Sequence, residues 1–231
     1  MIVAELGTVY ASDIPSERVN IILDHASAAK HCGADAVKVQ LFVPDEPLFC
    51  PMPGDEVRWE RWRKTHIVLD EWRRIYETCR ESYGIELFAS AFQDTAVDWC
   101  NELGFKWHKV ASRANKTYPY EKIPYDAAIV SGGNGFMTSL YCVSKYPTPL
   151  SEAMWPEVVD GSPDWNGLSD HSGTPWPSLD ALARGAEIIE VHFALDREMA
   201  GPDKQVSLGP GQLKLICDFR DALKEMGRCS A

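Results

Sequence analysis

The chain has 231 residues, of which 45% are hydrophobic and 25% are charged, and its formal net charge is −11 at pH 7. This length allows one large domain or two small ones, with enough apolar material for a core. The acidic balance argues against general affinity for nucleic acid, because phosphate backbones require a basic surface. The N-terminus enters strand-like residues without a basic region or a long apolar stretch. We therefore expect no signal peptide, no membrane association and a cytoplasmic location.

The seven cysteines are scattered singly along the chain, and no pair has the CxxC spacing typical of zinc sites. An odd number excludes a fully paired set of disulfides. We therefore predict reduced thiols that lie mainly in the core.

Short apolar runs alternate with helical patterns along most of the chain. Strands are predicted at 2–6, 35–42, 85–92, 106–112, 127–132, 139–146, 167–171 and 187–193. Helices are predicted near 16–32, 66–82, 94–103, 175–184 and 210–225. Segment 58–64, RWERWRK, combines arginine with tryptophan as stacking platforms for single strands do, but we interpret it as the start of an amphipathic helix. No repeat or linker marks a boundary, so residues 1–231 are predicted to form a single domain.

Eight strands separated mostly by helices imply parallel pairing and predict an α/β fold, the closed (β/α)8 TIM barrel. The alternative is an open doubly wound sheet, which requires a glycine-rich phosphate turn after the first strand. The first strand continues as ELGTVYAS, which is not GxGxxG. The barrel is therefore favoured.

The barrel is predicted to be reduced, because residues 133–138 (GNGFMT) are too few for a helix between the fifth and sixth strands. Parallel neighbours normally need a crossover of about a dozen residues. The short segment reaches across only if it is nearly extended, at roughly 3.3 Å per residue. We expect Gly132, Gly133 and Gly135 to take the unusual dihedral angles of this path.

A missing helix would leave the outward apolar side chains of these two strands uncovered. An exposed apolar strip marks a contact surface, so we expect a homodimer or a complex with another protein. The alternative is that flanking helices or segment 113–124 cover the gap from within.

Polar residues gather at the C-terminal strand ends, where barrels carry their active sites. They are Glu5, Lys38, Gln40, Ser90, Lys109, Ser112, Ser131, Ser144, Tyr146, Ser169, His171 and His192. Taken singly, a lysine here is more often a surface group and a serine is filler. A buried lysine or glutamate is costly unless it is paired or binds a ligand. Their convergence therefore predicts a site for a phosphorylated or carboxylated anion.

Two of the six histidines end neighbouring strands, His171 and His192. Adjacent barrel strands place such side chains within reach of one divalent ion, with open positions for water and substrate. Spacing alone leaves metal binding open. The other histidines are interpreted as structural and are His25, His31, His66 and His108.

Six segments resemble, in order, successive signatures of the N-acetylneuraminate (sialic acid) synthase family. They are VAELG, GADAVKVQLF, KVAS, CVSKYPTP, GLSDHSG and EVHFALDREMAGPDKQVSLGPGQL, and together they span nearly the whole chain. The resemblance implies a (β/α)8 barrel that condenses phosphoenolpyruvate with a sugar aldehyde. It also implies a divalent metal ion, commonly Mn²⁺, although Mg²⁺ or another divalent ion is compatible with the same ligands.

The resemblance implies roles for individual residues. His171 and His192 would hold the metal, and Glu5, Gln40 and Asp203 would lie near its water and the acceptor. The phosphate and carboxylate of phosphoenolpyruvate would be bound by Lys38, Ser90, Lys109, Ser112, Ser131 and Ser169. Ser144, where the family commonly has asparagine, and Tyr146 would line the acceptor side.

The acceptor half departs from the family pattern. The Asn-His pair that usually follows the first strand is Val9-Tyr10 here, and the glutamate that meets the sugar is replaced by Ala114. The C-terminal antifreeze-like domain of typical members, which lends an arginine to the partner's acceptor site, has no counterpart in the sequence. We therefore expect an acceptor other than N-acetylmannosamine.

Two other functions stay open at this point. One is a non-catalytic binding or assembly subunit that retains the pocket, and the other is a metal-dependent aldolase or isomerase that does not use phosphoenolpyruvate. Retention of costly polar groups argues against the first, and the cluster of lysines and serines argues against the second.

Overall fold

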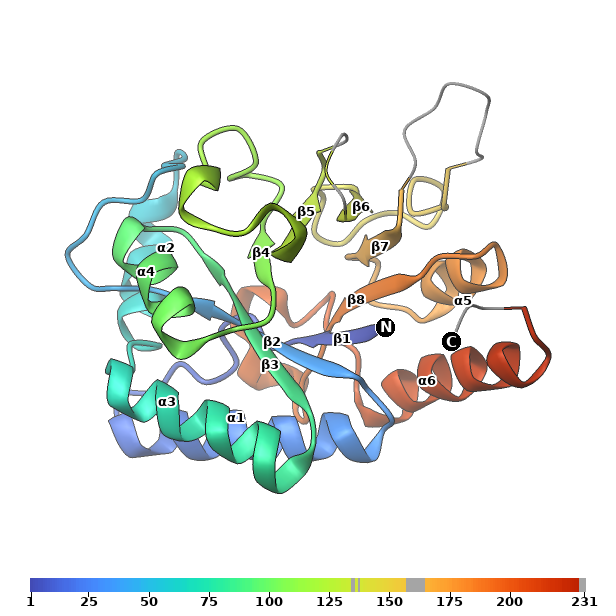
Figure 1. Cartoon of the computed structure of the whole chain (residues 1–231), viewed down its shortest axis with the longest axis horizontal. Coiled ribbons are helices and arrows are strands. Elements are labelled where there is room, and N and C mark those ends of the chain that lie inside the picture. The colour runs from blue at the N-terminus through green and yellow to red at the C-terminus, as the bar shows by residue number, and fades with distance from the viewer. Residues whose placement is uncertain (134–135, 137, 157–164, 229–231) are drawn as a thin grey trace.

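The computed structural model describes residues 1–133, 136, 138–156 and 165–228, and its strands form a closed parallel barrel (Figure 1). The strands are β1 (Ile2–Glu5), β2 (Ala36–Leu41), β3 (Glu86–Ala91), β4 (His108–Val110), β5 (Ala128–Ser131), β6 (Thr138–Cys142), β7 (Gly167–Asp170) and β8 (Ile188–His192). Each strand pairs with the next, and β8 closes the barrel on β1. The predicted (β/α)8 barrel is therefore confirmed, and the open doubly wound sheet is excluded.

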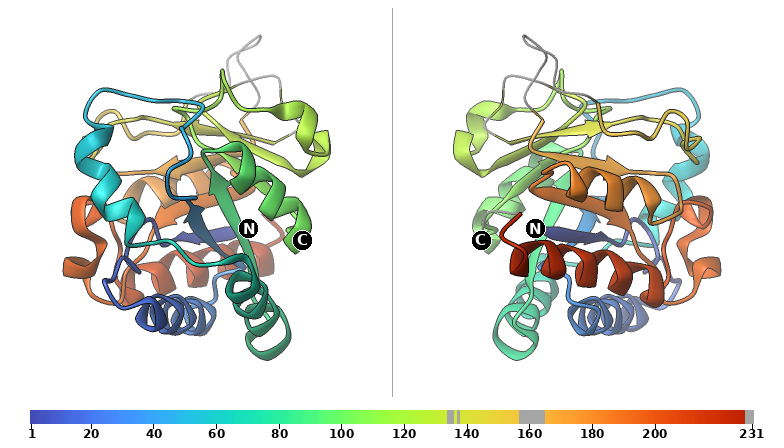
Figure 2. Two further views of the ribbon diagram at one scale, coloured as in Figure 1. Left: turned by 90° about the vertical axis from the view of Figure 1, so that its left-hand side faces the viewer. Right: turned by 90° about the vertical axis from the view of Figure 1, so that its right-hand side faces the viewer.

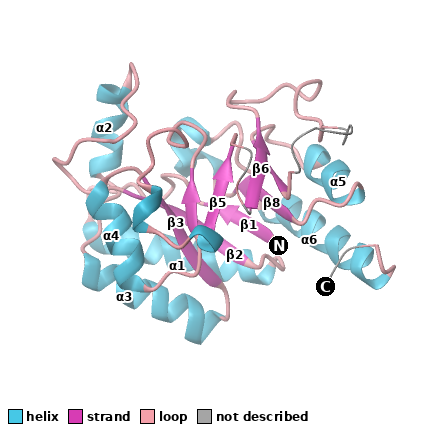
Figure 3. Ribbon diagram, turned by 45° about the horizontal axis from the view of Figure 1, so that its top comes forward, coloured by secondary structure: helices cyan, strands magenta, loops and turns pink. Residues whose placement is uncertain are grey.

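Helices cover two sides of the barrel, with α1, α3 and α4 along one side and α5 and α6 along the other (Figure 3). Their bounds are α1 (Pro15–His31), α3 (Leu69–Glu77), α4 (Asp94–Leu103), α5 (Trp176–Ala183) and α6 (Pro210–Glu225). The helix predicted near 66–82 is α3 continued by a π-helical turn at Thr78–Tyr83. The arginine- and tryptophan-rich segment lies mostly in a separate helix, α2 (Asp55–Arg63), between β2 and β3.

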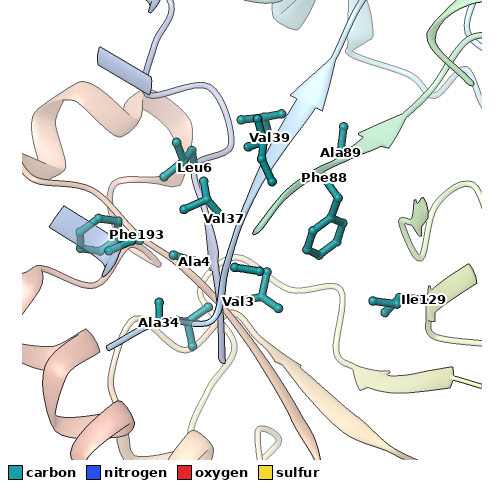
Figure 4. Close-up of a cluster of buried hydrophobic side chains, with 14 of the residues drawn as sticks. Val3, Ala4, Leu6, Ala34, Val37, Val39, Phe88, Ala89, Ile129 and Phe193 are labelled. Atoms are coloured by element: carbon teal, nitrogen blue, oxygen red, sulfur yellow. The ribbon is translucent and has the colours of Figure 1, made fainter. Parts of the chain in front are cut away.

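The lower part of the barrel interior is apolar. Side chains alternate along each strand, so the face that carries Glu5 also carries Val3, and the face that carries Ser90 also carries Phe88. Val3 and Phe88 are fully or almost fully buried, as is Ile129 on β5 (Figure 4). This apolar layer closes the barrel from below, and the polar residues lie in the layer above it.

The connection between β5 and β6 contains no helix among its described residues, as predicted. The φ of Gly132 is 66°, which is the left-handed conformation that the short path was expected to require. Gly133 does not take this left-handed conformation. Gly135 lies outside the described residues.

The predicted exposed strip on β5 is wrong. The outward residues Ala128 and Val130 are 1% and 0% exposed. Phe136 packs beside them and stacks on Tyr120 with ring centroids 4.9 Å apart, and both belong to the loops that flank this strand. Figure 2 shows the β4–β5 connection, which carries Tyr120, beside the barrel strands. The gap is thus covered from within over β5. On the β6 side, the outward Tyr141 and Val143 are only half-buried, so the predicted contact surface stays a prediction there.

The cysteines follow the prediction as far as the structure describes them. Those that are buried as free thiols are Cys32, Cys50, Cys79, Cys100 and Cys217, and Cys142 is a half-buried free thiol. None of the described helices is both long enough and apolar enough to cross a membrane.

Candidate active site

Four buried charged side chains meet in the upper barrel, and we call them the charged cluster: Glu5, Lys38, Lys109 and Glu190. Their exposures are only 1%, 4%, 2% and 5%. The Nζ of Lys38 lies 3.1 Å from Oε2 of Glu5 and 3.4 Å from Oε2 of Glu190. The Nζ of Lys109 lies 3.7 Å from Oε1 of Glu190. Since charges removed from water need close partners, the four groups depend on one another.

Serine hydroxyls on neighbouring strands accept hydrogen bonds from both lysines. Lys38 donates to Oγ of Ser90 at 3.0 Å, and Lys109 donates to Oγ of Ser131 at 2.8 Å. These four residues were predicted from the sequence to bind an anion, and the barrel brings them into one layer.

The two carboxylates of the charged cluster are also hydrogen-bonded. Ser169 donates its hydroxyl to Oε1 of Glu190 at 2.9 Å. Oε1 of Glu5 accepts from Nε2 of Gln40 and from the backbone N–H of Gly7, each at 3.1 Å. Oε2 of Glu5 accepts no hydrogen bond from the described residues and has the ion pair with Lys38 as its polar contact among them. This oxygen is therefore available to a further donor.

The charged forms of the cluster are unequally stabilised. Burial alone would raise the pKa of Glu190, but Lys109, Lys38 and Ser169 together lower it to about 2. Burial would lower the pKa of Lys38, yet Glu190 and Glu5 raise it above its usual value. The pKa of Lys109 is lowered, because burial outweighs the attraction of Glu190. A further anion beside Lys109 would therefore stabilise its charged form.

Glu190 was not among the residues predicted from the sequence. It precedes His192 by two positions in β8, and side chains two apart in a strand face the same side. A search along the inward face of each strand, rather than at the strand ends alone, would have found it.

The two histidines at the ends of β7 and β8 lie together. The ring centroids of His171 and His192 are 5.3 Å apart, and both side chains are buried. Nε2 of His171 is hydrogen-bonded to the hydroxyl of Tyr146 at 2.8 Å. Nδ1 of His192 lies 3.7 Å from Oδ2 of Asp203. Burial, with His192 and the lysines adding to it, lowers the pKa of His171 to about 3. His171 is thus a neutral imidazole, the form that binds metals.

The donor atoms fit a weak metal site. The part of the chain that the structure describes contains no group of three His, Cys, Asp or Glu side chains placed to hold a metal ion. Two close imidazoles, at least one of them neutral, can still bind a borderline divalent ion whose other positions are taken by water or substrate. The hydroxyl of Tyr146 would then have to give up its hydrogen bond to His171.

Three hydroxyl residues form a more exposed edge of the site, the hydroxyl rim: Ser112, Ser144 and Tyr146. The hydroxyls of Ser112 and Ser144 are 2.7 Å apart, and Tyr146 is 54% exposed. The sequence placed all three within strands, but β4 ends at Val110 and β6 ends at Cys142. The rim therefore belongs to the connections that follow the strands.

Arg113 and Ala114 lie in the β4–β5 connection, where the resemblance places the glutamate that meets the sugar. Neither residue is placed to take over that role. Arg113 forms an ion pair with Asp55 at the start of α2, with Nη2 and Oδ2 2.5 Å apart, and also donates to the backbone oxygen of Cys50. Ala114 is completely buried. Arg113 thus holds α2, and position 114 is inaccessible to a substrate.

A layer of buried lysines and serine hydroxyls at the mouth of a TIM barrel is typical of enzymes that handle phosphorylated or carboxylated substrates. Two matched stretches, residues 26–127 and 121–230, fit the model of the NeuB family. The chain therefore belongs to the NeuB family, the sialic-acid-synthase type of transferase, in which phosphoenolpyruvate and a sugar are joined by a new carbon–carbon bond.

Several named proteins are similar to this chain in sequence or in fold. The chain is 28% identical to the N,N'-diacetyllegionaminic acid synthase of Campylobacter jejuni, over 98% of the chain and 77% of that protein. It is 29% identical to the pseudaminic acid synthase of the same species, over 98% of the chain and 74% of that protein. The crystal structure of the sialic acid synthetase of Leptospira borgpetersenii superimposes with a TM-score of 0.74 and 21% identity, covering 97% of the chain and 84% of that protein. This last similarity concerns the fold alone.

Proposed function

We propose that this enzyme condenses phosphoenolpyruvate with an aldehyde, a sugar other than N-acetylmannosamine, to give a 2-keto-3-deoxy sugar acid and inorganic phosphate. The charged cluster carries this proposal, because it presents two buried lysines and their serine partners at the barrel mouth. The names of the relatives support the reaction class, since they include synthases of legionaminic and pseudaminic acids.

The proposal gives the lysines the task of binding the phosphoenolpyruvate anion. Lys38 is already neutralised by Glu5 and Glu190, whereas Lys109 has one described carboxylate within 4.0 Å, that of Glu190. Phosphoenolpyruvate would add negative charge beside Lys109. We assign its phosphate and carboxylate to Lys38, Ser90, Lys109, Ser112, Ser131 and Ser169.

The reaction needs one water and one new carbon–carbon bond. C3 of phosphoenolpyruvate attacks the aldehyde carbon, while water adds at C2, and the resulting intermediate then loses phosphate to leave the keto group. We propose that Glu5, through the oxygen that accepts no hydrogen bond, takes the proton of the attacking water. The alkoxide formed from the aldehyde oxygen takes the proton that Glu5 accepted from the water, and the C2 hydroxyl passes its remaining proton to the departing phosphate. Asp203 and Gln40 would orient the water and the acceptor. Ser144 and Tyr146 would contact the acceptor.

We propose that His171 and His192 hold a divalent cation, Mn²⁺ or another ion of similar preference. Such an ion supplies Lewis-acid polarisation of the aldehyde oxygen. Burial keeps His171 neutral for this task.

The proposal is tested by phosphate release from phosphoenolpyruvate in the presence of MnCl₂ and a panel of aldoses. We expect release that depends on both the aldose and the metal. Phosphate release without any aldehyde would indicate a phosphatase. Consumption of the aldehyde without phosphate release would indicate an aldolase. If neither reaction occurs, the chain is a binding subunit. Lys106→Ala, at an exposed site before β4, is the control for Lys109→Ala, which should abolish the activity.

Three wider expectations are kept as proposals. We propose that residues 1–231 act as one barrel domain and that the enzyme works in the cytoplasm. A homodimer or a complex with another protein stays a prediction, now without the support of an exposed strip on β5. Light scattering at micromolar concentration tests it.

A further inference from the structure

Arg61 on α2 links two loops that end at the site. Its Nε donates to Oγ1 of Thr8 at 2.7 Å, and its Nη2 donates to the backbone oxygen of Thr8 at 2.8 Å. The same Nη2 donates to the backbone oxygen of Met199 at 2.7 Å. Thr8 follows β1, and Met199 lies in the helical turn Arg197–Asp203 after β8. One guanidinium therefore joins three separate parts of the barrel mouth.

The backbone around Arg61 is shaped to receive it. Gly201 has a φ of 59°, and a Cβ at this position would lie 2.5 Å from Cζ of Arg61. A side chain there would thus displace the guanidinium. Two residues farther along the chain, Asp203 closes the same turn and lowers the electrostatic cost of burying Arg61.

The carboxylate of Asp203 is held by its backbone rather than by its own hydrogen bonds. No hydrogen bond from the described residues reaches its carboxylate oxygens, and its polar contact is His192 at 3.7 Å. Its Oδ2 also lies against Gly7, where an added Cβ would be 2.8 Å away. The place of this carboxylate therefore depends on the distance between the loops that Arg61 joins.

We propose that Arg61 is a positioning residue that fixes Asp203 at the acceptor side of the site. The proposal rests on the function proposed above, in which Asp203 orients the acceptor. It differs from a general stabilising role because Arg61 donates to the loops after β1 and β8, and no hydrogen bond or ion pair among the described residues joins it to the charged cluster. Loss of Arg61 should therefore lower kcat/KM for the acceptor more than it lowers the affinity for phosphoenolpyruvate.

The test compares Arg61→Gln, Arg61→Lys and the control Arg63→Gln. Arg63 lies on the same helix, is exposed and pairs with Asp45. We expect Arg61→Gln to lower kcat/KM for the aldose by about 100-fold, since a displacement of roughly 1 Å has this cost, and to change the affinity for phosphoenolpyruvate less than about threefold. Arg61→Lys should recover part of the loss, because it keeps the charge but cannot bridge both carbonyl oxygens.

A double-mutant cycle with Asp203→Asn shows whether Arg61 acts through Asp203. In the Asp203→Asn background, Arg61→Gln should add less than about threefold to the loss of kcat/KM. Additive losses would overturn the proposal. So would an Arg61→Gln variant that matches Arg63→Gln, or one that loses phosphoenolpyruvate affinity to the same extent as kcat/KM.

Hydrogen exchange separates this proposal from the proposed function. The amides of Val206 and Ser207 donate to the backbone oxygen of Asp203 and report on the order of this turn. Their exchange should accelerate roughly tenfold in Arg61→Gln and stay unchanged in Arg63→Gln. If the wild-type protein acts on no aldehyde, the proposed function fails, and unchanged exchange in Arg61→Gln would then overturn the positioning role as well.

Discussion

The charged cluster and the hydroxyl rim lie at the same barrel mouth but are built in opposite ways. Members of the cluster lie inside the strands and are at most 5% exposed, and they hold one another through ion pairs. Members of the rim lie in the connections after the strands, and Tyr146 is 54% exposed. The cluster is therefore fixed by the barrel itself, whereas the rim can change with the loops.

This difference matches the two substrates of the proposed reaction, since the cluster would bind phosphoenolpyruvate and the rim would contact the acceptor. The end of the site that would bind phosphoenolpyruvate cannot change one charge without unbalancing the others. The acceptor end is shaped by Arg113, which holds α2, and by the buried Ala114, and neither residue belongs to the cluster. A barrel of this kind can thus keep its chemistry while its acceptor changes.

The largest expected effect follows from removing the central carboxylate of the cluster. Glu190→Gln leaves Lys109 without a described carboxylate within 4.0 Å, so the free energy of unfolding should fall by about 3–5 kcal/mol. Chemical denaturation at pH 7 measures this loss. Glu187→Gln, at an exposed position before the same strand, is the control and should change little. Equal stabilities of the two variants would show that the cluster is not interdependent.

The next effect concerns ligand affinity. Lys38→Ala or Lys109→Ala should weaken phosphoenolpyruvate binding by about 2–4 kcal/mol, as expected for a charge-assisted contact in a buried site. Calorimetric titration of each variant measures it, with Lys106→Ala as the exposed control. Unchanged affinity in both variants would place the anion elsewhere.

The sequence predicted where the cluster side chains lie in the fold better than it predicted where the rim side chains lie, and the reasons are physical. Strands of a barrel alternate regularly and end at one mouth, so the convergence of Lys38, Lys109 and the serines could be predicted, although each lysine taken singly reads as a surface group. Glu190 was missed because only strand ends were searched. The direction of Arg113 and the packing of Phe136 over β5 depend on the paths of loops, which have no periodic pattern. The bridge made by Arg61 depends on a helix and two loops at once and has no sequence signature.

The buried Ala114, in the connection after β4, leads to a prediction about substrates. N-acetylmannosamine should be turned over with a kcat/KM about 100-fold below that of the preferred aldose, because the position of the family's glutamate is a buried alanine. Competition assays with phosphoenolpyruvate held constant measure this ratio. Ala114→Glu should not restore the activity, since its carboxylate would have to enter the core. Efficient turnover of N-acetylmannosamine by the wild-type enzyme would contradict this view of the acceptor end.

The smallest effect comes from the outer face of the barrel, where a buried histidine lacks the partners that the cluster has. His108 in β4 is 3% exposed, its Nδ1 has no hydrogen-bond partner in the part of the chain that the structure describes, and burial lowers its pKa to about 4. Between pH 6.5 and pH 4 the unfolded chain therefore binds more protons at this residue than the folded chain does. Stability should fall by about 2–3 kcal/mol through this residue as the pH decreases across that window, and the loss should be complete below pH 4.

His108→Phe removes the titrating group but keeps a buried ring. The difference in unfolding free energy between wild type and variant should therefore change with pH between 6.5 and 4 and become constant above about pH 7. His31→Gln, at an exposed position at the end of α1, is the control for removing a histidine away from β4. Denaturant titrations from pH 4 to pH 8 measure both. If the unfolding free energy of His108→Phe has the same pH dependence as that of the wild type, the outer face of β4 accommodates the charged imidazole. The contrast between the ion-paired cluster and an outer face without partners would then be wrong.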